Sequence, residues 1–203
     1  MSSAIQHISR LLAGEKPYTG DIGQDTEVFA YAIKLFLLNA TALAGIMLPA
    51  WQLGTLKATL LIWAAAQSLR IFAGGRHQSG PLKCWITTVV VFTLLGWLVT
   101  AGASLFSEYV LLFIALGSTF ALSTVIYHAP VTIASKQFAP AKRRKLKMAA
   151  TAVVVLWSVA ALAPLNAVFD QPTVPLAIIT GLVVQSLSVV DFSRADNRTT
   201  EAL

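Results

Sequence analysis

The single cysteine of this chain lies in its most chemically reactive stretch. Cys84 comes seven residues after His77, and Arg70, Arg76 and Lys83 flank the pair in the sequence. A free thiol has a pKa of about 8.5, so a nucleophilic cysteine at neutral pH needs a base or a positive field. His77 could serve as the base, and the three cations could supply the field. These residue types indicate a Cys–His dyad for nucleophilic catalysis.

Glycines in the same stretch give the backbone unusual freedom. Gly74 and Gly75 precede His77, and Gly80 and Pro81 precede Cys84. Such a chain can turn sharply and bring backbone N–H groups close to a substrate carbonyl, as an oxyanion hole requires. The alternative is purely structural, because a free cysteine is common in apolar segments and a loop rich in Gly and Pro often joins two helices.

Other residues could support the dyad. Arg70 could hold a carboxylate or stabilise a thiolate, although an arginine at the end of a membrane span also extends its head towards water without any such role. Asp191 could orient His77, or it could be an ordinary interfacial carboxylate. Three further polar residues have weaker claims: Gln67, Ser68 and the rival base His128.

The elements that carry these residues are predicted to be membrane-spanning helices. Of the 203 residues, 56% are hydrophobic and 12% are charged, about half the charged fraction of a soluble domain. Between the charged residues lie six long uncharged runs, and five of them have at least the roughly 20 residues that a spanning helix needs. We expect spans at about 27–49, 54–72, 85–105, 109–128, 148–166 and 173–191.

The predicted fold class is all-α: a polytopic integral membrane protein with six transmembrane helices and a short N-terminal amphipathic helix. We expect one domain over 1–203, with the amphipathic helix at 1–16, a membrane core at 27–191 and a cytoplasmic tail at 192–203. A frayed tail is the alternative for residues 1–16. The second span is short between Lys57 and Arg70, so a re-entrant segment is the alternative there.

The positions of the Lys and Arg residues predict the orientation of the chain in the membrane. With six spans both termini share one side, and placing them in the cytoplasm puts 13 of the 15 Lys and Arg there. Lys34 then lies in the first turns of span one, and Lys57 alone lies outside. The net charge of +6 is explained by this topology, so we expect membrane lipids as partners and no nucleic acid.

A dense basic run lies before the fifth predicted span. It could set the topology and contact anionic lipids, or it could dock an acidic peptide tail, and both roles can coexist. The candidate docking residues are Lys142, Arg143, Arg144, Lys145 and Lys147.

The pattern Arg-x3-Gly-Gly-x-His-x6-Cys, placed after the second span of a protein of this length, resembles the signature of the accessory gene regulator B (AgrB) family. Residues 129–147 resemble the second basic loop of that family. The resemblance implies a membrane cysteine endopeptidase that cuts the C-terminal tail from an AgrD-type precursor peptide of quorum sensing. Cys84 would attack the scissile carbonyl, and His77 would act first as base and then as acid.

The resemblance also implies that a Cys or Ser within the precursor attacks the resulting Cys84 thioester and closes a thiolactone or lactone ring. Exchange of one thioester for another is close to neutral in free energy, and the chain has no GxxxxGK[ST] motif for a nucleotide. We therefore expect no cofactor and no metal, and the resemblance suggests a homodimer. The alternative from another class is a small membrane transporter or scaffold whose glycines and prolines pack and bend its helices.

Overall fold

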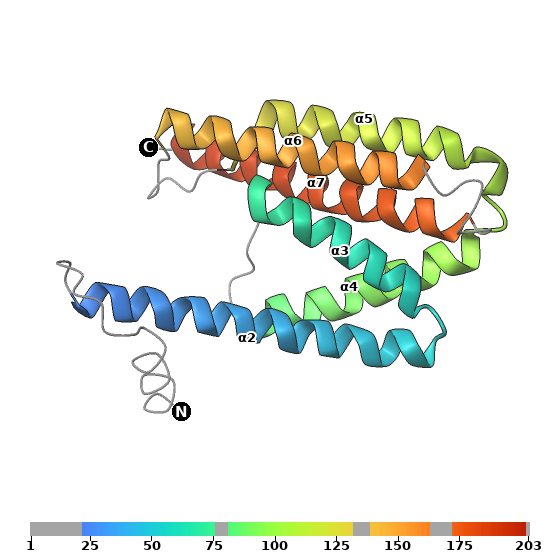
Figure 1. Ribbon diagram of the computed structural model, residues 1–203, viewed down its shortest axis with the longest axis horizontal. Helices are drawn as coiled ribbons and strands as arrows, with labels where there is room; N and C mark the ends of the chain where they lie inside the picture. Colours follow the sequence, from blue (N-terminus) through green and yellow to red (C-terminus); the bar gives the residue numbers. More distant parts are fainter. Residues whose placement is uncertain (1–21, 76–80, 132–138, 163–171, 202–203) are drawn as a thin grey trace. The chain divides into compact units, whose positions relative to one another are not determined.

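The computed structural model describes residues 22–75, 81–131, 139–162 and 172–201, and every regular element in these ranges is helical (Figure 1). The amphipathic helix expected at 1–16 lies outside the described residues. The elements are α2 (Ile22–Gln52), α3 (Leu56–Ala73), α4 (Pro81–Gly102), the 3₁₀ turn η1 (Ser107–Tyr109), α5 (Val110–His128), α6 (Pro140–Leu162) and α7 (Thr173–Glu201).

Five segments in the described part of the chain are helical, long and apolar enough to cross a bilayer. They are Leu56–Ala73, Leu82–Gly102, Ser107–His128, Pro140–Leu162 and Thr173–Val190. The first predicted span, 27–49, falls within α2, whose apolar segment Phe36–Gln52 is shorter than these five. The prediction of an all-α polytopic membrane protein is confirmed.

The boundaries of α3 follow from backbone geometry at each end. Gly54, with φ of 66°, forms the turn from α2, and Gly74, with φ of 76°, ends the helix. Both values lie in a region that side chains other than glycine rarely adopt. Between these turns α3 is one unbroken helix of 18 residues, without the reversal that a re-entrant segment needs.

The start of α6 differs from the prediction. We expected the span to begin at about residue 148, but the helix begins at Pro140 and includes the basic run. Proline suits the first position of a helix because its missing N–H would have no partner there, and Lys and Arg are good helix formers. The basic residues therefore lie on the first turns of a helix rather than in a loop.

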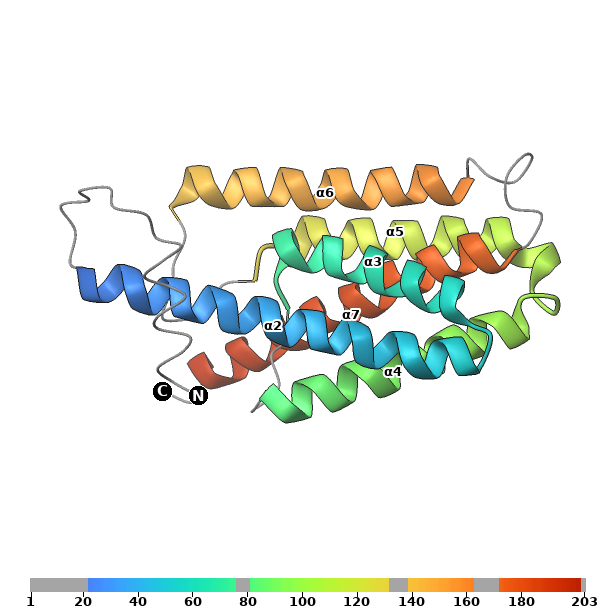
Figure 2. The ribbon, with the colours of Figure 1, turned by 60° about the horizontal axis from the view of Figure 1, so that its bottom comes forward.

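The chain divides into two parts, residues 1–45 and 46–203. Within the second part, α7 packs against α3, α4, α5 and α6 (Figures 1 and 2). Of the apolar segment of α7, 61% of the residues are buried, against 11% for α4. The bundle is therefore organised around α7, and α4 is its most exposed member among the five.

Small residues and one polar contact hold α3 in place. Gly181 of α7 lies against the backbone carbonyl of Ile62, and a Cβ added there would come within 2.9 Å of the Cβ of Ala65. On another side of α3, the indole Nε1 of Trp157 on α6 donates to the hydroxyl of Ser68 at 2.8 Å. Such close packing and interhelical hydrogen bonds are the main sources of helix association in a bilayer. They fix the helix that ends at Gly74.

Candidate active site

Cys84 lies in the first turn of α4. Its side chain is partly buried and its thiol is free. The Thr88 hydroxyl donates to the Cys84 carbonyl at 2.7 Å, within the helix. Backbone N–H groups without helical partners gather at a helix N-terminus, and their partial positive charge favours an anion nearby. The thiol predicted to be the nucleophile is thus held on a helix rather than in a loop.

His77 lies in residues 76–80, outside the described residues. The dyad of Cys84 and His77 therefore stays a prediction from the sequence. Chain connectivity still limits how far His77 can be from Gly75 and from Cys84, because it is two residues from the first and seven from the second.

The Gly74–Gly75 turn is the best defined part of the candidate site. The Gly74 N–H donates to the Arg70 carbonyl at 3.0 Å and closes the last turn of α3. The Gly74 carbonyl accepts a hydrogen bond of 2.7 Å from the side-chain amide of Gln185 on α7. The turn is therefore held by a helix more than 100 residues further along the chain.

Gln185 was not among the residues selected from the sequence. Its side chain is only 4% exposed, and it lies in an uncharged run that was assigned to the membrane. The available signal was chemical: an amide inside a predicted span needs a hydrogen-bonding partner. The sequence did not show which group that partner would be.

The remaining predicted supporting residues have different placements. Arg70 is partly buried in the last turn of α3, and His128 is the last residue of α5. Ser68 donates to the Ala65 carbonyl and accepts from Trp157, which gives its hydroxyl a packing role. The backbone of Asp191 lies within α7, but its side chain is outside what the structure describes.

The basic cluster forms one end of α6. Four of its members are exposed, and Lys147 is partly buried: the exposed residues are Lys142, Arg143, Arg144 and Lys145. The preceding connection from α5 is tied to the candidate site, because the Val131 N–H donates to the Ala73 carbonyl at 3.0 Å. The connections after α3 and after α5 are thereby held against each other.

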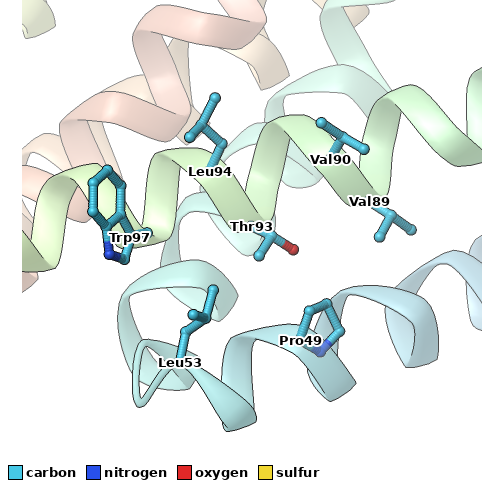
Figure 3. Close-up of a pocket in the computed structure, with 7 residues that line it drawn as sticks. All are labelled: Pro49, Leu53, Val89, Val90, Thr93, Leu94 and Trp97. Atoms are coloured by element: carbon cyan, nitrogen blue, oxygen red, sulfur yellow. The ribbon is translucent and has the colours of Figure 1, made fainter.

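A separate groove of about 390 Å³ lies between the C-terminal end of α2 and the middle of α4 (Figure 3). Its lining contains one polar side chain, that of Thr93, among apolar ones: Pro49, Leu53, Val89, Val90, Leu94 and Trp97. None of the predicted site residues lines this groove. Its apolar character suits hydrocarbon, and it offers no group for peptide chemistry.

The fold and these residues define a multi-helix integral membrane protein with a free thiol in the first turn of one helix and a glycine turn at the end of the preceding helix. A sequence model described as "AgrB: Accessory gene regulator B" matches residues 5–189, so the chain belongs to the accessory gene regulator B family. The resemblance noted from the sequence is confirmed.

Two curated relatives are similar to this chain. "Accessory gene regulator protein B" of Staphylococcus intermedius is 25% identical over 133 residues, which cover 65% of this chain and 64% of that protein. "Putative AgrB-like protein 1" of Clostridium perfringens is 25% identical over 131 residues, which cover 64% of each chain. The similarity thus spans slightly less than two thirds of either relative. No solved structure matches this chain.

Proposed function

We propose that this protein is a membrane cysteine endopeptidase of accessory gene regulator quorum sensing that removes the C-terminal tail of an AgrD-type precursor. The observation that carries the proposal is the placement of Cys84: a free, partly buried thiol in the first turn of α4, at the far end of a connection that starts with the anchored Gly74–Gly75 turn. Membership of the accessory gene regulator B family supports the same function.

The proposed chemistry uses two side chains. His77 takes the thiol proton, and the Cys84 sulfur attacks the carbonyl carbon of the scissile peptide bond. The C–N bond breaks, the amine of the tail leaves with the proton from His77, and the rest of the precursor stays on Cys84 as a thioester. A Cys or Ser of the precursor then attacks this thioester, closes a thiolactone or lactone ring and returns the thiol of Cys84.

Substrate docking is assigned to the basic end of α6. Its four exposed cations can attract an acidic peptide tail, and the bond between Val131 and Ala73 holds the preceding connection beside the end of α3. We further propose that both termini and this site face the cytoplasm, that the cluster contacts anionic lipids, and that the protein acts as a homodimer.

The test is cleavage by the purified protein in liposomes with an AgrD-type precursor, followed by mass spectrometry. We expect release of the tail peptide and a cyclic product. With a precursor whose ring-closing residue is replaced by Ala, we expect a mass increase on the protein equal to the acyl fragment, and no such adduct on Cys84→Ala. Tail release by Cys84→Ala at the wild-type rate would refute the cysteine-peptidase mechanism, and no tail release by the wild type or by Cys84→Ala would instead favour a transporter or scaffold.

A further inference from the structure

The side chain of Gln185 reaches from α7 to the end of α3. Its Nε2 donates to the Gly74 carbonyl at 2.7 Å, and the side chain is almost completely buried. The Gly74 carbonyl follows the last turn of α3, where backbone acceptors lack partners within the helix. An amide buried among apolar helices therefore satisfies one of these acceptors, and each group meets the other's need for a partner.

The same amide also lies close to the next residue, Gly75. A Cβ added to Gly75, where φ is +155°, would lie 2.8 Å from the Nε2 of Gln185 and 3.0 Å from the hydroxyl of Ser188. A side chain at this position would therefore displace the amide or the turn. Gly75 therefore lacks a side chain at a point where side chains of α7 lie against the turn.

A second bond restrains the turn from another direction. The Ala73 carbonyl accepts the N–H of Val131 from the connection after α5. Two successive carbonyls, those of Ala73 and Gly74, are thus each held by a group distant in the sequence. With both directions fixed, the chain leaves α3 from a defined point with a defined orientation.

That point governs the site because His77 is two residues beyond Gly75. Two residues of extended chain reach about 7 Å, so the position of Gly75 limits how far away the backbone of residue 77 can be. We propose that Gln185 is a positioning residue of the peptidase, holding the Gly74–Gly75 turn so that His77 meets Cys84. This inference rests on the proposed function.

The experiment compares three variants with the wild type in liposomes. Gln185→Met keeps a similar volume but removes the donor, and Gln185→Ala removes both the donor and the bulk. Thr180→Val is the matched control, because Thr180 is a polar residue of α7 whose hydroxyl donates to Leu176 of its own helix at 2.7 Å. We expect Gln185→Met to lower kcat for precursor cleavage roughly 10- to 100-fold with little change in KM, since misplacing a reacting group by about 1 Å has effects of this size.

A double-mutant cycle tests the contact itself. Gly75→Ala alone should lower kcat, because the new methyl group meets the amide of Gln185. In the Gln185→Ala background the contact with the amide is gone, while the Ser188 hydroxyl and the positive φ still oppose the methyl group. Gly75→Ala should therefore still lower kcat there, but cost roughly fivefold less than it does in the wild type. Equal losses in both backgrounds would show that Gly75 and Gln185 act independently and would overturn the proposal.

Alkylation of Cys84 gives a readout that does not depend on peptidase activity. It is the only cysteine in the sequence, so a maleimide reports on it directly. Because Cys84 is partly buried, we expect a looser connection to raise its alkylation rate in Gln185→Met and leave it unchanged in Thr180→Val. Wild-type kcat and wild-type alkylation in Gln185→Met, or equal losses in Thr180→Val, would overturn the proposal. Cleavage by Cys84→Ala would instead refute the proposed function, while the alkylation rates would still test the contact.

Discussion

The backbone N–H of Val131 donates to the carbonyl of Ala73 across 3.0 Å. This bond joins the connection after α5 to the end of α3. Two backbone groups in direct contact must lie at the same depth in the membrane, so the two connections share one side whatever the orientation of the protein. The count of Lys and Arg places the same two connections together on independent grounds.

We predict that both connections are cytoplasmic. Single cysteines introduced as Ser79→Cys or Ser135→Cys in a Cys84→Ala background should resist an impermeant thiol reagent added to intact cells and react after the cells are opened. The reason is the excess of basic residues assigned to this side. Labelling of both cysteines from outside would show that the topology is opposite to the one predicted. Labelling of only one of them would contradict the hydrogen bond between Val131 and Ala73.

Cys84→Ala and His77→Ala should each abolish precursor cleavage while the protein still inserts in the membrane. Nucleophile and base act as one unit, so the double variant should be no slower than either single variant. The measurement is single-turnover tail release by purified protein. A multiplicative loss in the double variant would mean that His77 does not act through Cys84, and His128 would then be the next base to test.

Neutralising the basic cluster should weaken binding of the precursor more than it slows the chemical step. Changing Lys142, Arg143, Arg144 and Lys145 together to Gln should raise KM at least several-fold with a smaller change in kcat, because exposed charges act mainly on encounter and register. Wild-type activity should also fall as salt rises, since the Debye length is only about 8 Å at physiological ionic strength.

The control for this variant is Lys57→Gln at the other end of α3, which removes a charge far along the helix from the Gly74 turn. It should leave KM unchanged. If the cluster serves topology alone, the quadruple variant should insert wrongly, and its correctly inserted fraction should show wild-type KM at both ionic strengths.

Replacing Gly181 should loosen the bundle. In Gly181→Val the new side chain meets Ala65 and the backbone of Ile62, and overpacking of this kind costs about 1–3 kcal/mol. We expect a lower Tm in detergent. Ala152→Val on α6 is the control, because Ala152 is exposed. Equal Tm values for Gly181→Val and the wild type would mean that α3 and α7 can separate without loss of stability.

The lengths of the uncharged runs predicted the positions of the helices, and five of the six expected spans lie within a described helix or match one to within four residues at each end. The fourth span, expected at 109–128, is α5 at Val110–His128. The start of α6 was placed eight residues too late, because hydropathy measures preference for hydrocarbon and not for helix. Lys142 to Lys147 are charged yet favour a helix, a preference that a search for uncharged runs cannot register.

The candidate site was only partly predictable. The spacing of Gly74, Gly75, His77 and Cys84 is local and can be read along the chain. Gln185 is 111 residues from its partner, and nothing in its own neighbourhood indicates that it meets the Gly74 carbonyl. A side-chain amide in a span indicates that it needs a hydrogen-bonding partner, but the identity of the partner depends on how α3 and α7 pack.

The central position of α7 has a consequence for biosynthesis. It is the last described helix to leave the ribosome, yet it is the most buried of the five spanning candidates and it contacts the other four. Until it inserts, α3 and α5 lack their main packing partner and the Gly74 carbonyl lacks its amide donor. Cys84 is therefore synthesised early, while the hydrogen bond from Gln185 that holds the preceding glycine turn forms last. A nascent chain stalled before α7 therefore carries Cys84 without the hydrogen bond that holds the Gly74 carbonyl.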